Sequence, residues 1–259
     1  MPRPYLRNGM SENIFKIGLV SYLNACPLGH GLSDDSFFNV QLVPPSWLAS
    51  MLENEIVDVA LVPVVDYLGH QNEWEICVPY GICSSGEVWT VRIFSPVPIG
   101  KIETLIVDID SHTSIALAEI LIHRLTGKKP ELQFWDFSQM PKVISEPSLL
   151  IGDKAWQVKN AKYIYDLGEL WREQFKLPFV YAVWCSRKDK IPQTVKNLLV
   201  ETAKKNLERL EELAGLYGPA HGFSVDDAFT YFSRIIHYPI GLQELAAINR
   251  FKECLECRE

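Results

Sequence analysis

The stretch Ile17-Gly18-Leu19-Val20-Ser21-Tyr22-Leu23-Asn24 decides the fold class of this chain. Its first four residues form a short apolar run with β-branched members, which predicts a strand. Residues 21–28 then form a loop that enters a helix, and further strands are predicted at 38–43 and 57–62. This order of nearly continuous apolar strands and helices is typical of βαβ units, so we predict an α/β fold with a parallel sheet.

The same rhythm begins again after the break Ser95-Pro96-Val97-Pro98-Ile99-Gly100. An amphipathic helix is expected at 112–125, and the expected strands are 104–108, 132–135, 149–151 and 179–184. From Ile191 onward we expect helices only, including a long one over 195–217 that Gly218-Pro219 stops.

Two α/β units and a helical C-terminal tail predict two lobes with a ligand cleft between them. If the tail packs on the first unit, the chain makes two interdomain crossovers. We therefore predict a discontinuous first lobe, 14–95 plus 187–259, and a second lobe over 96–186. This is the layout of a hinged two-domain binding protein.

Composition and charge exclude several classes of protein. The 259 residues are 47% apolar and carry a net charge of −7, which argues against a nucleic-acid binder because such proteins need a basic surface. No apolar run approaches the ~20 residues of a membrane span, and the basic start lacks the apolar region of a secretion signal. We expect a cytoplasmic protein whose six cysteines are reduced, with neither nucleic acid nor membrane as a partner.

The common motifs for cofactors and metals are missing from the sequence. There is no phosphate-binding P-loop, no dinucleotide-binding G-x-G-x-x-G after a strand, no H-E-x-x-H and no G-x-S-x-G. Cys254-x-x-Cys257 has no second pair to complete a zinc site. We therefore expect neither a cofactor nor a metal.

Small polar residues gather in turns that follow predicted strands. They lie in Ser21 to Pro27, in the turn from Ser84 and Ser85 to Thr90, in Asp110-Ser111-His112-Thr113-Ser114, and at Asp153. Ligands of open α/β sheets bind at the carboxyl ends of strands, and helix N-termini suit anions. Each turn also has a plainer explanation: Ser111, Thr113 or Asp153 as helix caps, and Ser84-Ser85-Gly86 as a simple hairpin. Their joint arrangement favours a cleft for a small anionic substrate.

The segment Val20-Ser21-Tyr22-Leu23-Asn24-Ala25-Cys26-Pro27-Leu28 resembles the V-S-[YF]-L-N-[AC]-x-P-L motif of the chorismate dehydratase family, which acts in the futalosine route to menaquinone. The similarity extends over residues 16–186 in blocks of the same order. These blocks are 58–68, 150–155, 165–171 and 177–184.

The resemblance implies a type II periplasmic-binding-protein-like fold and a lyase reaction. Water leaves chorismate, and the product is 3-[(1-carboxyvinyl)oxy]benzoate. Asn24 matches the family's catalytic asparagine, and Thr90 falls where members usually have a serine for the substrate carboxylate. Ser111, Thr113 and Ser114 match an S-R-T-S turn that would bind the other carboxylate, and Ser84, Ser85, His112 and Asp153 complete the expected substrate-binding set.

The departures from the family pattern fall in the same turns. His112 replaces the usual arginine, and Ser84-Ser85-Gly86-Glu87 replaces S-D-G-P. A histidine supplies less positive charge at neutral pH than an arginine. Arg92 and Lys154 are the nearest candidates for additional cationic help.

Two alternatives stay open at this point. The altered turns allow a non-catalytic binding protein for a small aromatic or dicarboxylate ligand. The related 1,4-dihydroxy-6-naphthoate synthase shares the fold, but its S-P-C-P-N-D start motif does not match residues 21–27.

Overall fold

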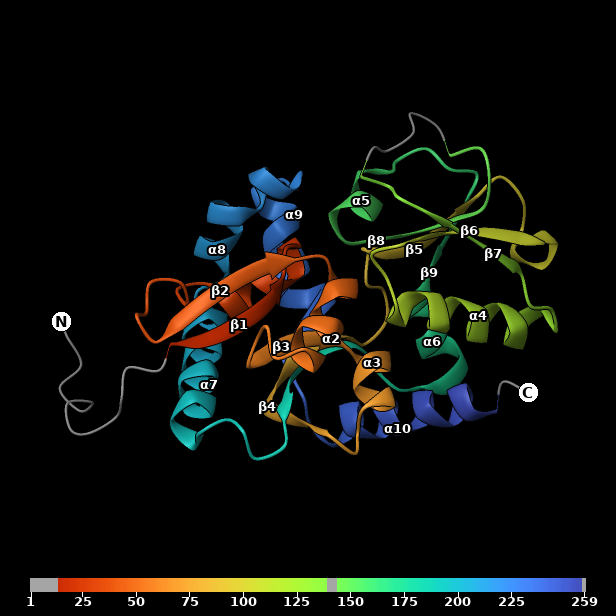
Figure 1. Cartoon of the computed structure of the whole chain (residues 1–259). Helices are drawn as coiled ribbons and strands as arrows, with labels where there is room; N and C mark the ends of the chain where they lie inside the picture. The colour runs from red at the N-terminus through yellow and green to blue at the C-terminus, as the bar shows by residue number, and fades with distance from the viewer. Residues whose placement is uncertain (1–13, 139–143, 258–259) are drawn as a thin grey trace, which may run out of the picture.

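The computed structural model describes residues 14–138 and 144–257. Two β-sheets, each with its own helices, form two lobes that lie side by side (Figure 1). Helix α10, Leu242–Glu256, contacts β10 of the first lobe and α4 of the second, so the end of the chain touches both lobes. The two-lobed α/β architecture predicted from the sequence is confirmed.

The first sheet has the strand order β11-β4-β10-β3-β1-β2. Its strands are β1 (Phe15–Val20), β2 (Phe38–Val43), β3 (Val59–Pro63), β4 (Trp74–Ser84), β10 (Phe179–Arg187) and β11 (Ile236–Pro239). β1 pairs in parallel with β2 and β3, whereas β10 runs antiparallel to β3 and β4. The parallel part is the βαβ unit expected from the apolar runs, and β3 is buried along its whole length.

The second sheet has the strand order β7-β6-β8-β5-β9. Its strands are β5 (Val91–Ser95), β6 (Thr104–Asp108), β7 (Glu131–Trp135), β8 (Ser148–Ile151) and β9 (Tyr163–Asp166). β6 pairs in parallel with β7 and β8, and β5 runs antiparallel to β8 and β9. The carboxyl ends of β6 and β8 lead directly into the turns that face the first lobe.

Helices cover both sheets. Those of the first lobe are α1 (Cys26–Gly29), α2 (Pro45–Glu53), α3 (Val64–Gly69), α7 (Gln193–Leu207), α8 (Leu210–Tyr217), α9 (Val225–Thr230) and α10; those of the second are α4 (Thr113–Thr126), α5 (Gly152–Gln157) and α6 (Leu167–Phe175). Short 3-10 turns cover Leu23–Ala25 (η1), Ile99–Lys101 and Pro219–His221, and a π-helix covers Tyr231–Ile235. No helix in the described ranges has the length and hydropathy needed to span a membrane.

The chain passes from one sheet to the other at positions that differ from the predicted lobe boundaries. Val91–Ser95, expected in the first lobe, pairs with β8 and β9 of the second sheet. Phe179–Arg187, expected almost entirely in the second lobe, pairs with β3 and β4 of the first. The chain crosses at 85–90 and at 176–178 because the turns between strands of different sheets lie there. The proline-rich break at 95–100 lies within the second lobe, between the end of β5 and the 3-10 turn Ile99–Lys101.

The C-terminal tail differs from the prediction in two ways. It contains strand β11, which pairs with β4, so it is not purely helical. The long helix predicted over 195–217 is broken at Glu208 and Arg209 into α7 and α8. The second part still ends at Tyr217, before Gly218-Pro219, where the sequence predicted the stop.

Asp166 anchors the first crossing. It is the last residue of β9 and caps α6 by accepting hydrogen bonds from the N–H groups of Gly168 and Glu169. Its two oxygens also accept from the backbone N–H groups of Val88 and Trp89, at 2.9 and 2.8 Å. One nearly buried carboxylate therefore fixes the chain where it passes from β4 to β5.

Candidate functional site

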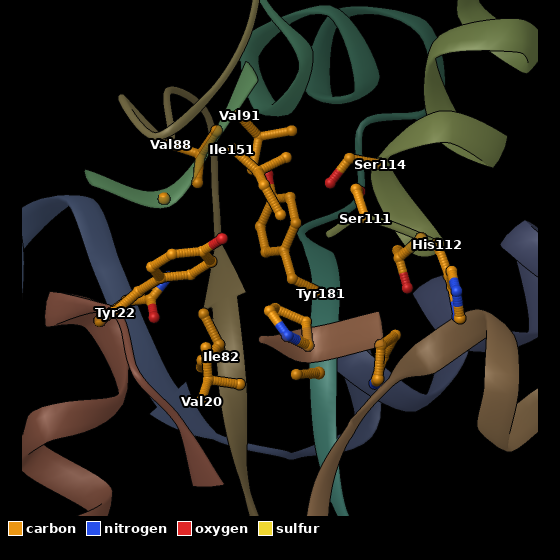
Figure 2. Close-up of a pocket in the computed structure, with 16 residues that line it drawn as sticks. Val20, Tyr22, Ile82, Val88, Val91, Ser111, His112, Ser114, Ile151 and Tyr181 are labelled. Carbon is orange, nitrogen blue, oxygen red and sulfur yellow. The ribbon is translucent and has the colours of Figure 1, made fainter. Parts of the chain in front are cut away.

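A pocket lies between the lobes, at the carboxyl ends of strands β1, β3, β6 and β8 (Figure 2). It is lined by Val20, Tyr22, Asn24, Pro45, Pro63, Ile82, Val88, Val91, Ser111, His112, Thr113, Ser114, Ile151, Gly152, Tyr181 and Ala182. Its volume of about 60 Å³ is below the roughly 300 Å³ at which small-molecule sites begin. The pocket as it stands in this structure is therefore too small for a typical ligand and has to widen before a substrate can enter.

The N-terminal end of α4 forms one side of the pocket. Ser111, Thr113 and Ser114 are all less than a tenth exposed, and Figure 2 shows Ser111 and Ser114 on the side opposite Tyr22. The N-cap residue of α4 is His112, and its side chain makes no capping hydrogen bond. The N–H groups of the first turn therefore need acceptors from outside the helix, and the helix dipole favours an anion there.

His112 forms an ion pair across the lobes. Its Nδ1 lies 3.0 and 2.9 Å from the two carboxylate oxygens of Asp66 on α3. The hydrogen bond to Asp66 raises the pKa of His112 above its ordinary value, against the opposing effect of partial burial. The carboxylate of Asp66 thus favours the protonated form of the ring beside the α4 N-terminus.

Asn24 lies in η1, directly after β1, because the loop following the first strand folds back into the cleft. Its side-chain oxygen Oδ1 is buried and has no hydrogen-bond partner within the described residues. A buried acceptor left unpaired costs about 1–3 kcal/mol, so such atoms persist mainly where function needs them. Asn24 thus lines the pocket and carries a buried acceptor that the described residues leave unpaired.

Two tyrosines of the pocket were missed from the sequence. Tyr22 donates a hydrogen bond to Asp110, at 3.4 Å, and burial with nearby aspartates raises its pKa. Tyr181, on β10, lies between the two sides in Figure 2, and burial raises its pKa as well. Both lie inside the sequence blocks that resemble the family. An aromatic residue among small polar ones after a strand was the available signal for Tyr22, whereas Tyr181 lies within the apolar strand β10 and offered no such signal.

Three of the expected binding residues, Ser84, Ser85 and Thr90, lie outside the lining. Ser84 is buried, and its hydroxyl lies 3.0 Å from the Tyr181 hydroxyl, behind the pocket wall. Ser85 is exposed in the crossing turn. Thr90 is 1% exposed, and its Oγ1 lies 2.6 Å from the hydroxyl of Tyr231. In this closed arrangement the structure brings together Asn24 and residues 111–114, and direct contact of the other three with substrate stays a prediction.

Asp153 also lies outside the lining and joins the lobes. Its Oδ1 accepts the backbone N–H of Leu23 at 3.2 Å, and its Oδ2 lies 2.7 Å from Nδ1 of His221. Asp153 lies in the first turn of α5, and the N-cap of this helix is Ile151. The plainer explanation of Asp153 as a helix cap is therefore wrong. Both of its oxygens are thus used by the first lobe.

The two cationic side chains considered from the sequence, Lys154 and Arg92, form ion pairs outside the pocket lining. Lys154 Nζ lies 2.7 Å from carboxylate oxygens of both Asp108 and Asp110. Arg92 Nε lies 3.0 Å from Asp166. Neither belongs to the lining. Among the described lining residues, His112 is therefore the one side chain that can carry positive charge.

The pocket holds few groups for metal or acid–base chemistry. The titratable residues of its described lining are Tyr22, His112 and Tyr181. Over the described ranges, no three His, Cys, Asp or Glu side chains gather in a metal-binding arrangement. What the arrangement offers is hydrogen bonding, a helix N-terminus and an apolar wall.

Comparison with known proteins agrees with this geometry. A family model described as "Menaquinone biosynthesis" matches residues 15–256. A chorismate dehydratase from Thermus thermophilus is 27% identical over 219 residues, which cover 77% of this chain and 80% of that protein.

Two solved structures share the fold. A protein from Archaeoglobus fulgidus has a TM-score of 0.76 at 14% identity, covering 96% of this chain and 99% of that one. The periplasmic aliphatic sulphonate binding protein from Escherichia coli has a TM-score of 0.60 at 11% identity, covering 95% and 87%. The periplasmic-binding-protein-like fold expected from the resemblance is confirmed.

Proposed function

Because this chain belongs to the menaquinone biosynthesis family, we propose that it is a carbon–oxygen lyase that dehydrates chorismate to 3-[(1-carboxyvinyl)oxy]benzoate in the futalosine route. The observation that carries the proposal is the pocket itself, which is lined by Asn24 with its unpaired side-chain oxygen, by a helix N-terminus and by an apolar wall. Chorismate has matching features, with two carboxylates, a ring and a leaving hydroxyl.

One substrate carboxylate binds at the N-terminus of α4. The backbone N–H groups of its first turn, with the hydroxyls of Ser111 and Ser114, supply donors for it. When its ring is protonated, which Asp66 favours, His112 adds positive charge at the same end. Although the protein is acidic overall, the N–H groups at the start of α4 and the side chain of His112 thus bind the carboxylate in place of the family's usual arginine.

The substrate ring packs on the apolar part of the lining. Val20, Ile82 and Ile151 project from strands of both lobes, so closure encloses the ring from two sides. Enclosure excludes water and holds the ring in one orientation. Because the product ring is aromatic, orientation and support of the leaving group are the main tasks left to the protein.

Asn24 holds the hydroxyl that leaves from C4. Its unpaired Oδ1 accepts the hydroxyl proton in a hydrogen bond and thereby fixes the C4–O bond relative to the ring. Replacing Asn24 by Ala removes this contact without filling the site.

The proton on C3 leaves to the substrate's own enolpyruvyl carboxylate. The pKa values of Tyr22 and Tyr181 are raised by burial, so both phenols stay protonated, and Nδ1 of His112 is engaged with the Asp66 carboxylate. The C3–H electron pair becomes the new ring π bond, the C4–O bond breaks, and hydroxide leaves. The carboxylic acid returns the proton to the hydroxide, which gives water.

The test compares the wild-type protein with Asn24→Ala and with Asn39→Ala, an exposed asparagine on β2. We expect kcat of Asn24→Ala to fall about a hundredfold, as for loss of an oriented polar contact to the reacting group. The melting temperature of each variant, with and without chorismate, separates loss of chemistry from loss of fold. Equal turnover by Asn24→Ala and Asn39→Ala would remove Asn24 from the mechanism.

A binding protein without catalysis is the second candidate, favoured by His112 in place of the family's arginine. It predicts that chorismate raises the melting temperature and is recovered unchanged.

A cytoplasmic location is part of the main proposal. The six free cysteines, three of them buried in the core, support a reducing compartment.

A further inference from the structure

A second cavity lies where the C-terminal half of α4 faces the end of α10. Its volume is about 450 Å³, within the range of roughly 300–1,000 Å³ that small-molecule sites occupy. Its walls include Ile120 and Arg124 of α4, Phe175 at the end of α6, and Arg250 and Cys254 of α10. Figure 1 shows α10 passing below α4 and α6 in this view. The proposed reaction makes no use of this cavity.

Two arginines of the cavity meet at one aromatic ring. The guanidinium carbon of Arg124 lies 4.8 Å from the centroid of the Phe175 ring, and that of Arg250 lies 5.2 Å from it. Cation–π contacts of this kind are attractive, so the ring holds both side chains at the cavity wall. Because both distances end at the same ring, the two guanidinium groups are close enough for one small molecule to reach both.

Both guanidinium groups keep donors for a ligand. Arg124 donates through Nε to Oε1 of Gln174 at 3.2 Å, and Arg250 donates through Nη1 to Oε2 of Glu253 at 2.6 Å. A guanidinium group carries further N–H donors, and no other hydrogen bond to a described residue uses them. Their planar arrangement matches a carboxylate or a phosphate, which can accept two parallel hydrogen bonds. The free donors therefore suit acidic groups.

The charge of the lining also favours an anion. Its cationic side chains are Arg124, Lys129 and Arg250, and its carboxylates are Glu119 and Glu253. The cavity thus has an excess of positive charge even when its histidine is neutral, in a chain whose net charge is −7. A metal ion fits less well, because over the described ranges the cysteines and histidine of the lining do not gather into a metal-binding group.

We propose that this cavity is a regulatory site for a small organic anion, whose acidic groups pair with Arg124 and Arg250 and whose carbon body contacts Ile120 and Phe175. A single inorganic ion would leave most of the 450 Å³ unfilled, and the apolar part of the wall without a partner. The acidic groups are carboxylates or phosphates, since both match the guanidinium donors.

A ligand in this cavity acts on the arrangement of the two lobes. Helix α10 contacts β10 and α3 of the first lobe as well as α4 of the second. Helix α4 runs from this cavity to the substrate pocket, which its first residues line. A ligand that fits α4 and α10 as they lie here favours this arrangement, in which the substrate pocket is narrow, and therefore slows turnover. This effect rests on the proposed function, whereas binding of the anion does not.

Isothermal titration with isophthalate and, separately, with phenyl phosphate tests the site and distinguishes carboxylate from phosphate. We expect at least one of them to bind, and Arg124→Gln and Arg250→Gln each to weaken that binding about tenfold or more, because charge-assisted hydrogen bonds are lost. Arg234→Gln, at an exposed position outside the cavity, is the matched control. Binding of neither anion, or equal binding by Arg124→Gln and Arg234→Gln, would overturn the proposal.

Two further measurements separate this cavity from the substrate pocket. His112→Asn should leave the arginine-dependent binding unchanged, since His112 lines the other pocket. Cys257 is exposed and lines this cavity, so the bound anion should slow its alkylation by iodoacetamide in the wild type, and Arg250→Gln should lose this protection. Loss of binding in His112→Asn, or alkylation of Cys257 at an unchanged rate, would place the anion elsewhere and overturn the site.

Turnover of chorismate tests the regulatory effect. We expect the saturating anion to cause a loss of turnover in the wild type and in Arg234→Gln that is absent in Arg124→Gln. Unchanged turnover with the site filled would overturn the regulatory role. A wild-type protein that leaves chorismate intact would overturn the proposed function instead, and titration and labelling would still decide whether the cavity binds the anion.

Discussion

Gly152 of the second lobe lies directly against the ring of Tyr22 in the first. A Cβ atom at Gly152 would lie 2.6 Å from the nearest Tyr22 ring carbons, closer than side chains tolerate. Both residues line the pocket, and Gly152 begins α5 with a φ of +61°. The close approach of the lobes at the site therefore depends on the absence of a side chain at one position.

Gly152→Ala tests this dependence. We expect it to keep the lobes apart and to lower kcat/KM by at least about tenfold, because misplacement of the two sides by ~1 Å is costly. Gly127→Ala is the control, since Gly127 has a φ of +71° with nothing within 4 Å of an added Cβ. Gly127→Ala also places a side chain at a positive φ, but its Cβ atom does not collide with a neighbouring residue. Steady-state kinetics, with small-angle scattering for lobe separation, make the comparison, and equal activity of the two variants would contradict it.

The ion pair between His112 and Asp66 predicts a pH dependence of substrate binding. Because the pKa of His112 is raised, its positive charge is present below that pKa and lost as pH rises through it. We expect KM for the dianionic substrate to increase across that range. Asp66→Asn should move the increase to lower pH, because the hydrogen bond that raises the pKa is weakened.

Two variants at position 112 complete this prediction. His112→Arg should keep KM low and make it independent of pH, since arginine does not titrate in this range. His112→Asn should raise KM about threefold to tenfold at low pH. His123→Asn, an exposed histidine on α4, is the control. An unchanged KM–pH profile in His112→Arg would show that His112 supplies no charge to the substrate.

Asp153 predicts an effect on closure rather than on direct binding. Its oxygens hold Leu23 and His221 of the first lobe, so Asp153→Asn weakens a contact made only when the lobes meet. Hydrogen bonds to charged groups contribute about 1.5–3 kcal/mol, which corresponds to a loss of ligand affinity of roughly tenfold or more. Isothermal titration with product measures it, and Asp136→Asn, at an exposed position of the second lobe, is the control. Unchanged affinity in Asp153→Asn would contradict a role in closure.

Asp166 predicts the largest effect on stability. Its carboxylate accepts the N–H groups of Val88 and Trp89, caps α6 and pairs with Arg92. Asp166→Ala leaves these donors unpaired, and we expect it to lower the free energy of unfolding by about 3–5 kcal/mol. Urea denaturation measures the loss. Asp226→Ala, at an exposed position in the first turn of α9, should change it by less than about 1 kcal/mol, and a similar small loss in Asp166→Ala would show that the crossing does not need the anchor.

Local patterns predicted most of the secondary structure. The helix expected at 112–125 is α4, Thr113–Thr126, because its apolar residues repeat at helical spacing. Strand β11 escaped prediction because four residues between two helices carry too little pattern. The lobe boundaries differed because sheet membership depends on long-range pairing, which neither proline nor apolar runs encode.

The candidate site was predicted in part for the same reason. Asn24 and residues 111–114 line the pocket, since a loop after a strand and a helix N-terminus are local features. Thr90 has the same local appearance, yet Tyr231, distant in sequence, covers it. Asp153 likewise faces His221. Which side of a turn meets the cleft is decided by partners far along the chain.

The most direct test of the central claim is to incubate the protein with a large molar excess of chorismate and to follow all products over time by liquid chromatography and mass spectrometry. The account predicts a new aromatic species lighter than chorismate by one water molecule. This species should exceed the protein in amount, be absent without protein and form about a hundredfold more slowly with Asn24→Ala. Chorismate that disappears no faster than in buffer alone, with no such species formed, would contradict the account.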